Sequence, residues 1–167
     1  SSGAVQCWGS NSSGQSSPPS VTFVQISAMG LTTCGLDSSG SIQCWGWGSS
    51  GLISDIPSGT FVQVSLSSHA CAIDTDGNVH CWGRDDLNQV SDTPSGTFTQ
   101  ISAGNTKNCA IDTEGNVHCW GGWDSSAQTP PPSGTFVQVS AGSQHSCGID
   151  SSGAVQCWGS NSSGQSS

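Results

Sequence analysis

Positive charge is almost absent from this sequence, and its absence limits the partners that the protein can bind. Arg84 and Lys107 are the two basic residues among 167, against eleven acidic residues, and the formal net charge is −9. Two cations cannot neutralise a phosphate backbone, so we do not expect nucleic acid as a partner. The same shortage argues against docking on an anionic lipid surface.

Long apolar runs are missing as well. No segment approaches the ~20 apolar residues that a membrane-spanning helix needs, and no signal peptide is recognisable, so we expect no membrane insertion. Hydrophobic residues make up 32% of the chain, a thin supply for a core, whereas there are nine cysteines. A chain of this kind usually adds disulfides, which indicates an oxidising compartment and an extracellular or cell-surface location.

The cysteines mark an internal repeat, which is the first thing to establish in such a chain. Each unit has a Pro-Ser-x-Thr-Phe segment, then one cysteine, then a second cysteine ten residues later in a Cys-Trp-Gly tripeptide. The tripeptides begin at Cys7, Cys44, Cys81, Cys119 and Cys157, with spacings of 37, 37, 38 and 38 residues. We therefore divide the chain into four repeats, 18–54, 55–91, 92–129 and 130–167, preceded by residues 1–17 as the tail of a truncated repeat.

Each repeat is predicted to be all-β. Segments such as "TFVQVS" alternate apolar and polar residues, as half-buried strands do. In "CAIDTDGNVHC", a three-residue loop Thr75-Asp76-Gly77 with a left-handed glycine places Cys71 opposite Cys81 at a non-hydrogen-bonded position. Cα atoms there lie roughly 4.5–5.5 Å apart, which a disulfide tolerates, and the bridge falls on the buried side. The predicted disulfides are Cys34–Cys44, Cys71–Cys81, Cys109–Cys119 and Cys147–Cys157, which leaves Cys7 without a partner.

Strands of this length with a Trp-Gly signature in every unit suggest propeller blades. "VSAGSQHSCGIDSSGAVQCWGSNSSGQ" (139–165) resembles the repeat of the regulator-of-chromosome-condensation family, in its short, cysteine-containing secreted version. The resemblance implies blades of antiparallel sheet, of which family members usually close about seven into a ring. Four repeats are too few for that ring. We expect an all-β fold of tandem antiparallel blades of about 37–38 residues, either propeller-like or an open superhelical array.

Catalysis and metal binding are not expected, and neither is a cofactor. A catalytic site should break the repeat, and no repeat carries a distinctive acid, base or nucleophile set. "DTDGN" (74–78) looks like part of a calcium loop but lacks the downstream bidentate carboxylate, so a plain turn is favoured. His69, Cys71, His80 and Cys81 could form a zinc set, but repeats without both histidines keep both cysteines, which favours a disulfide.

Candidate contact residues lie outside the regular motif. The five motif tryptophans recur in every unit, which favours packing between blades over sugar binding. Trp47 and Trp123 lie in linkers and are the better candidates for contact with a ligand. Asn11 and Asn161 begin Asn-x-Ser sequons and are predicted glycosylation sites. The Pro-flanked Ser and Thr residues of "SSPPS" and "TPPPS" are possible sites of O-linked glycan.

The two ends of the sequence are identical: residues 1–17 equal residues 151–167, 150 positions apart. This identity indicates either one period of a longer array or an engineered duplication. In an array, "PPSVTFVQIS" would follow from position 168, and a cysteine ten residues before Cys7, four positions before Ser1, would pair with it. We therefore expect a non-catalytic extracellular structural repeat protein, a self-associating segment of a filament or surface fibre. The alternative is a secreted propeller that binds a protein or glycan through its linker loops.

Overall fold

The computed structural model describes residues 3–122 and 130–167, which form twelve strands and one short 3₁₀ turn, η1 (Ser49–Gly51). The strands make four separate three-stranded antiparallel sheets, with strand orders β1-β2-β3, β4-β5-β6, β7-β8-β9 and β10-β11-β12. Each sheet therefore uses three strands that are consecutive in sequence, and each falls within one repeat. The strands are β1 (Phe23–Met29), β2 (Thr32–Asp37), β3 (Ile42–Gly46), β4 (Phe61–Leu66), β5 (His69–Asp74), β6 (Val79–Gly83), β7 (Phe98–Ala103), β8 (Lys107–Asp112), β9 (Val117–Gly121), β10 (Phe136–Ala141), β11 (His145–Asp150) and β12 (Val155–Gly159).

The second hairpin of each sheet has the register that its turn residues predict. Cys71 pairs with Cys81, Ile73 pairs with Val79, and the Asp74 N–H donates to the Asn78 carbonyl at 3.0 Å. Gly77 has a φ of 87°, the left-handed conformation that the loop requires and that glycine adopts without steric cost. The structure has a disulfide at each of the four predicted pairs, with Cα–Cα distances of 4.0–4.1 Å.

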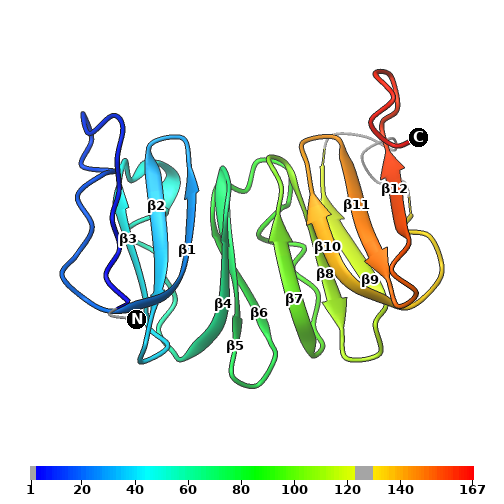
Figure 1. Ribbon diagram of the computed structural model, residues 1–167, viewed down its shortest axis with the longest axis horizontal. Helices are drawn as coiled ribbons and strands as arrows, with labels where there is room; N and C mark the ends of the chain where they lie inside the picture. Colours follow the sequence, from blue (N-terminus) through cyan, green and yellow to red (C-terminus); the bar gives the residue numbers. More distant parts are fainter. Residues whose placement is uncertain (1–2, 123–129) are drawn as a thin grey trace.

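The four sheets stand side by side in an open row, with residues 3–17 at one end and β12 at the other (Figure 1). Every sheet packs on the next, because the first strand of the following sheet lies against the first two strands of the preceding one. Between neighbouring sheets lies a small apolar core. The first core joins Cys34, Leu36 and Ile42 of one sheet to Phe61, Val64, Leu66, Ala70, Ala72 and Trp82 of the next, with Leu52 from the linker between them.

The middle strand of an inner sheet is covered on both faces, which strand periodicity alone did not indicate. His69, Ala70, Cys71, Ala72 and Ile73 are all buried in β5, because a neighbouring sheet lies on each side. The predicted burial of the bridges holds in full only for the first cysteine of the first three: Cys34, Cys71 and Cys109 are completely buried, their partners are partly buried, and in the fourth bridge both Cys147 and Cys157 are only partly buried. No further sheet follows the fourth in the described chain to cover them.

Candidate functional site

The contact between neighbouring sheets includes a repeated set of polar bonds. The Gln63 side chain accepts the Ile101 N–H at 3.0 Å and donates to the Ile101 carbonyl at 3.1 Å. Two residues along the strand, Ser65 Oγ accepts the Ala103 N–H at 2.9 Å. The glutamine and serine side chains in the first strand of one sheet thus bind the backbone of the first strand in the next sheet. The same bonds recur between β7 and β10, from Gln100 to Val139 and from Ser102 to Ala141.

A second recurring contact lies at the hairpin turn. The Gly77 carbonyl accepts the N–H of Phe98, the first residue of the next sheet, at 2.8 Å. A Cβ at Gly77 would lie 2.4 Å from Thr97 Cγ2, so the close approach excludes any side chain as firmly as the positive φ does. The turns at Gly40, Gly77 and Gly115 are therefore docking points for the sheets that follow them.

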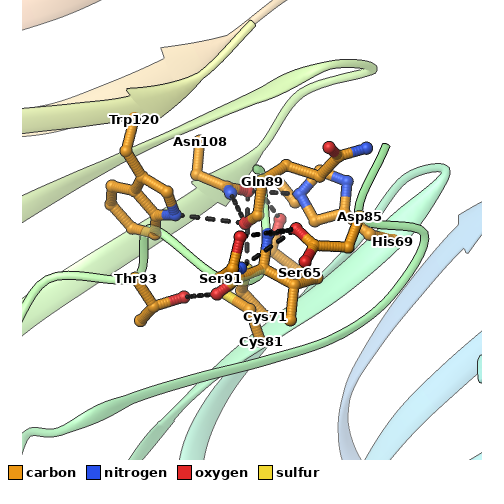
Figure 2. The surroundings of a disulfide bond; sticks show 12 residues. Ser65, His69, Cys71, Cys81, Asp85, Gln89, Ser91, Thr93, Asn108 and Trp120 are labelled. Carbon is orange, nitrogen blue, oxygen red and sulfur yellow. Dashed lines mark hydrogen bonds between the residues drawn. A yellow bond between two sulfur atoms is a disulfide. The ribbon is translucent and has the colours of Figure 1, made fainter. Parts of the chain in front are cut away.

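The third recurring contact joins a motif tryptophan to the preceding linker. Figure 2 shows it beside the Cys71–Cys81 bridge, where the Gln89 carbonyl accepts both Trp120 Nε1 at 3.1 Å and Asn108 Nδ2 at 2.7 Å. Asn108 Oδ1 in turn accepts the His69 Nε2–H at 2.6 Å, and all these groups are buried. Burial lowers the pKa of His69, against the smaller opposing effect of its bond to Asn108. Burial therefore favours the neutral form of this histidine, and the cluster joins two sheets and a linker.

Residues 3–17 make the second and third of these contacts with the first sheet, although they do not form a full sheet themselves. The Gly3 carbonyl accepts the Phe23 N–H at 3.0 Å, and the Gln15 carbonyl accepts Trp45 Nε1 at 3.0 Å. The segment therefore occupies the place of a preceding repeat's turn and linker. It supplies no strand to cover the rest of the sheet, which is left open.

The N-terminal face consists of Ile26, Ala28 and Leu31 beside this segment. Ile26 is 48% exposed, whereas its counterparts Val64 and Ile101 are 1% and 2% exposed. A groove of about 310 Å³ runs between the face and the segment, lined by Cys7, Trp8, Ser10, Gln15, Ser16, Ile26, Ala28, Gly30, Leu31, Thr32 and Thr33.

The C-terminal face, at the other end of the row, consists of Gln138, Ser140, Ile149, Gly153 and Val155. Val155 is 67% exposed, whereas its counterpart Val79 is 8% exposed. A Cβ at Gly153 would meet nothing within 4 Å, although the turn has the same positive φ as the inner turns. Each end thus exposes groups that are covered at every inner contact.

The acidic turns are organised by internal hydrogen bonds. Asp74 Oδ1 accepts the backbone N–H groups of Asp76 and Asn78, and Oδ2 accepts His80 Nε2 at 2.8 Å. Burial raises the pKa of Asp74, but the bonds from His80 and Asn78 outweigh it and hold the pKa well below its usual value. The carboxylate oxygens are engaged in fixing the turn. In residues 3–122 and 130–167, no group of three or more His, Cys, Asp or Glu side chains could hold a metal ion.

The structure describes one of the two predicted contact residues. Trp47 is 57% exposed, and Trp123 lies outside the described residues. Packing of the motif tryptophans holds for four of the five, but the expectation was wrong for Trp8, which is 87% exposed. Trp8 lacks the first two strands of its own repeat, on which the other four pack. The sequons at Asn11 and Asn161 lie in exposed loops, and each side chain accepts an N–H from Ser16 or Ser166 at 2.9 Å.

The glutamines and serines that link the sheets were missed at the sequence level. Their signal was present, since a Gln-x-Ser triplet recurs in the first strand of every repeat. Within the described residues, no helix is long and apolar enough to span a bilayer.

Comparison with known proteins identifies the repeat. The family model described as "Regulator of chromosome condensation (RCC1) repeat" matches residues 67–89, 98–128 and 136–165, which together are half of the chain. A search of curated proteins gave no match.

Solved structures show the same arrangement of blades. The entire ectodomain of the receptor kinase CR4 from Physcomitrella patens matches 97% of this chain with a TM-score of 0.81 at 24% identity, over 48% of its own length. The CRINKLY WD40 ectodomain of the receptor kinase ACR4 from Arabidopsis thaliana matches 84% with a TM-score of 0.72 at 28% identity, over 51% of its length. Prp20p from Saccharomyces cerevisiae matches 86% with a TM-score of 0.69 at 17% identity, over 46% of its length. The chain thus spans about half the length of these proteins.

Proposed function

The chain belongs to the regulator of chromosome condensation (RCC1) repeat family, and from this premise we propose that it is an extracellular, non-catalytic structural protein that builds a filament or surface fibre. The four hairpin disulfides and the similarity to two receptor ectodomains support an extracellular location. The near-equivalence of the four repeats supports a structural role, because in residues 3–122 and 130–167 no repeat carries a side-chain set of its own that would act on a substrate.

The observation that carries the proposal is the pair of open end faces. Ile26 at one end and Val155 at the other are exposed, while Val64 and Val79, which hold the same positions at inner contacts, are buried. A stack of repeats that presents the same type of contact at both ends can extend without a natural stop. Lys107 is buried, so Arg84 is the one basic side chain on the described surface, which offers little positive charge for a soluble ligand to recognise.

Electron microscopy of the purified, oxidised protein over a range of concentrations tests this function. We expect unbranched filaments that lengthen as the concentration rises. Particles of one fixed size at every concentration would overturn the filament and favour the alternative function.

That alternative is a secreted module that binds a protein or glycan through its linkers. It is favoured by the 28% identity to the ACR4 ectodomain and by Trp47, a large aromatic side chain exposed in a linker. Glycan and protein arrays probed with the protein and with Trp47→Ala test it. Binding that the substitution removes supports this module, and the absence of any specific binding argues against it.

A further inference from the structure

The two end faces are complementary in their hydrogen-bonding groups. At inner contacts, the glutamine side chain in the first strand of one sheet binds the backbone of the residue after the glutamine in the first strand of the next sheet. The serine side chain likewise accepts the backbone N–H of the residue after the serine of that next strand. Gln138 and Ser140 hold these positions at the C-terminal face, and neither side chain has a hydrogen bond within the described chain. Ile26 and Ala28 hold the receiving positions at the N-terminal face, and no side chain of the described residues bonds to their backbone.

The segment beside the N-terminal face is a copy of the segment that ends the chain. Gly3 and Gln15 contact Phe23 and Trp45, and residues 153–167 carry the same sequence as residues 3–17. The loop of the C-terminal copy has the same internal bonds, since the Gln165 side chain accepts the Ser163 N–H at 2.8 Å just as Gln15 accepts that of Ser13. The C-terminal copy therefore already has the local conformation that fits the first sheet.

We propose that the C-terminal face of one copy of this chain docks on the N-terminal face of a second copy, where residues 153–167 of the first replace residues 3–17 of the second. In this contact Gln138 binds the backbone of Ile26, Ser140 accepts the Ala28 N–H, and the Gly153 carbonyl accepts the Phe23 N–H. The inference rests on the proposed filament function and gives the contact by which the filament grows.

The first sheet gains more from contact with a second copy than from contact with its own residues 3–17. Residues 153–167 form the same hydrogen bonds to the first sheet that residues 3–17 give up, because the two sequences are identical. In addition, strands β10, β11 and β12 of the incoming copy cover Ile26 and bury their own Ile149 and Val155, as happens at inner contacts. The competing segment is attached to the same chain and so has a high effective concentration, which makes assembly depend on protein concentration.

Two lysine substitutions test the contact in the full oxidised chain. Ile26→Lys blocks the N-terminal face and Val155→Lys blocks the C-terminal face, and both side chains are exposed in the single copy, so folding is expected to survive. Val137→Lys is the matched control, since Val137 is 63% exposed and the equivalent residue is exposed in every repeat. Sedimentation velocity should show association of the wild type and the control, and a loss of roughly 100-fold or more in association constant for each blocked variant.

Mixing the two blocked variants shows whether the contact is head to tail. Ile26→Lys keeps a working C-terminal face and Val155→Lys keeps a working N-terminal face, so an equimolar mixture should form a dimer of one copy of each. A mixture that stays monomeric while the control assembles would overturn the proposal. Filaments of both variants indistinguishable from those of the wild type would also overturn it, but would leave the proposed function standing. A wild type that stays monomeric would overturn both, and a closed ring of fixed size would support the contact and overturn the filament.

A pair of glycine substitutions tests the exchange of segments. A Cβ at Gly3 would lie 2.3 Å from Thr22 Cγ2, so Gly3→Val should weaken the chain's own segment and raise the association constant about ten-fold. Gly153→Val brings the same clash to the second copy's Thr22 and should lower association. If both substitutions change association in the same direction, residues 3–17 and 153–167 do not compete for one place and the proposal fails.

Discussion

Replacing Cys71 and Cys81 by alanine removes the bridge of an inner sheet, and the structure predicts how much stability is lost. The two cysteines are ten residues apart, and for a loop of that size the chain-entropy relation gives about 2.7 kcal/mol at 25 °C. Cys71 is completely buried in the core between the second and third sheets, so the missing sulfur atoms cost about 1 kcal/mol more in packing. The total expected loss is about 4 kcal/mol in the free energy of unfolding.

The bridge between Cys147 and Cys157 is the matched control. It closes a loop of the same length, so the chain-entropy contribution is equal, but both cysteines are only partly buried. Its replacement by alanines should cost about 3 kcal/mol, and the difference between the two double variants isolates the packing contribution. Urea unfolding followed by tryptophan fluorescence measures both losses. Equal losses would refute the packing argument, and losses below about 1 kcal/mol in both would refute the role of the bridges as the main stabilising element.

Four further outcomes are expected. Hydrogen bonds from Ser152 and Gln156 lower the pKa of Asp150 to about 2. Because the folded pKa lies below the unfolded value, the stabilisation is present above about pH 4 and is lost as the pH falls toward 2. An acid titration of the folded protein should therefore show a smaller loss of stability in Asp150→Asn than in the wild type. Burial lowers the pKa of His69, so stability should also fall as the pH drops below about 6.5, and His69→Gln should remove that part of the pH dependence in urea titrations. Gly77→Ala, which places a Cβ 2.4 Å from a threonine methyl, should lower the melting temperature by several degrees more than Gly153→Ala, which meets nothing; equal shifts would mean that φ alone matters. We expect a glycan on Asn161 in material from a glycosylating secretory host, and a peptide mass equal to that of the bare sequence would contradict it.

The hairpins could be predicted from the sequence because their determinants are local. An Asp followed three residues later by Gly fixes the turn, and the turn fixes which residues face each other across the two strands. The pairing of Cys71 with Cys81 follows from counting outward, and the recurrence of the two cysteines gives the number of sheets. The family resemblance rests on the same local signals.

The contacts between sheets could not be predicted in the same way, because they join residues of different repeats. The recurring Gln-x-Ser triplet marks Gln63, but it does not indicate that the side chain binds the backbone at Ile101, 38 residues away. The buried cluster of His69, Asn108 and Gln89 likewise takes one group from each of three segments. Such contacts depend on how one sheet is placed on the next, which strand periodicity does not specify.

The duplicated ends show which features depend on the local sequence and which depend on the tertiary structure. The loops at Asn11 and Asn161 have the same hydrogen bonds, to Ser16 and Ser166 at 2.9 Å, because those bonds depend only on neighbours in sequence. Trp8 and Trp158 are nevertheless 87% and 5% exposed, although the seventeen residues around them are identical. The sequence alone determined the local conformation, and the tertiary structure decided burial, because burial depends on whether the strands that complete the sheet are present.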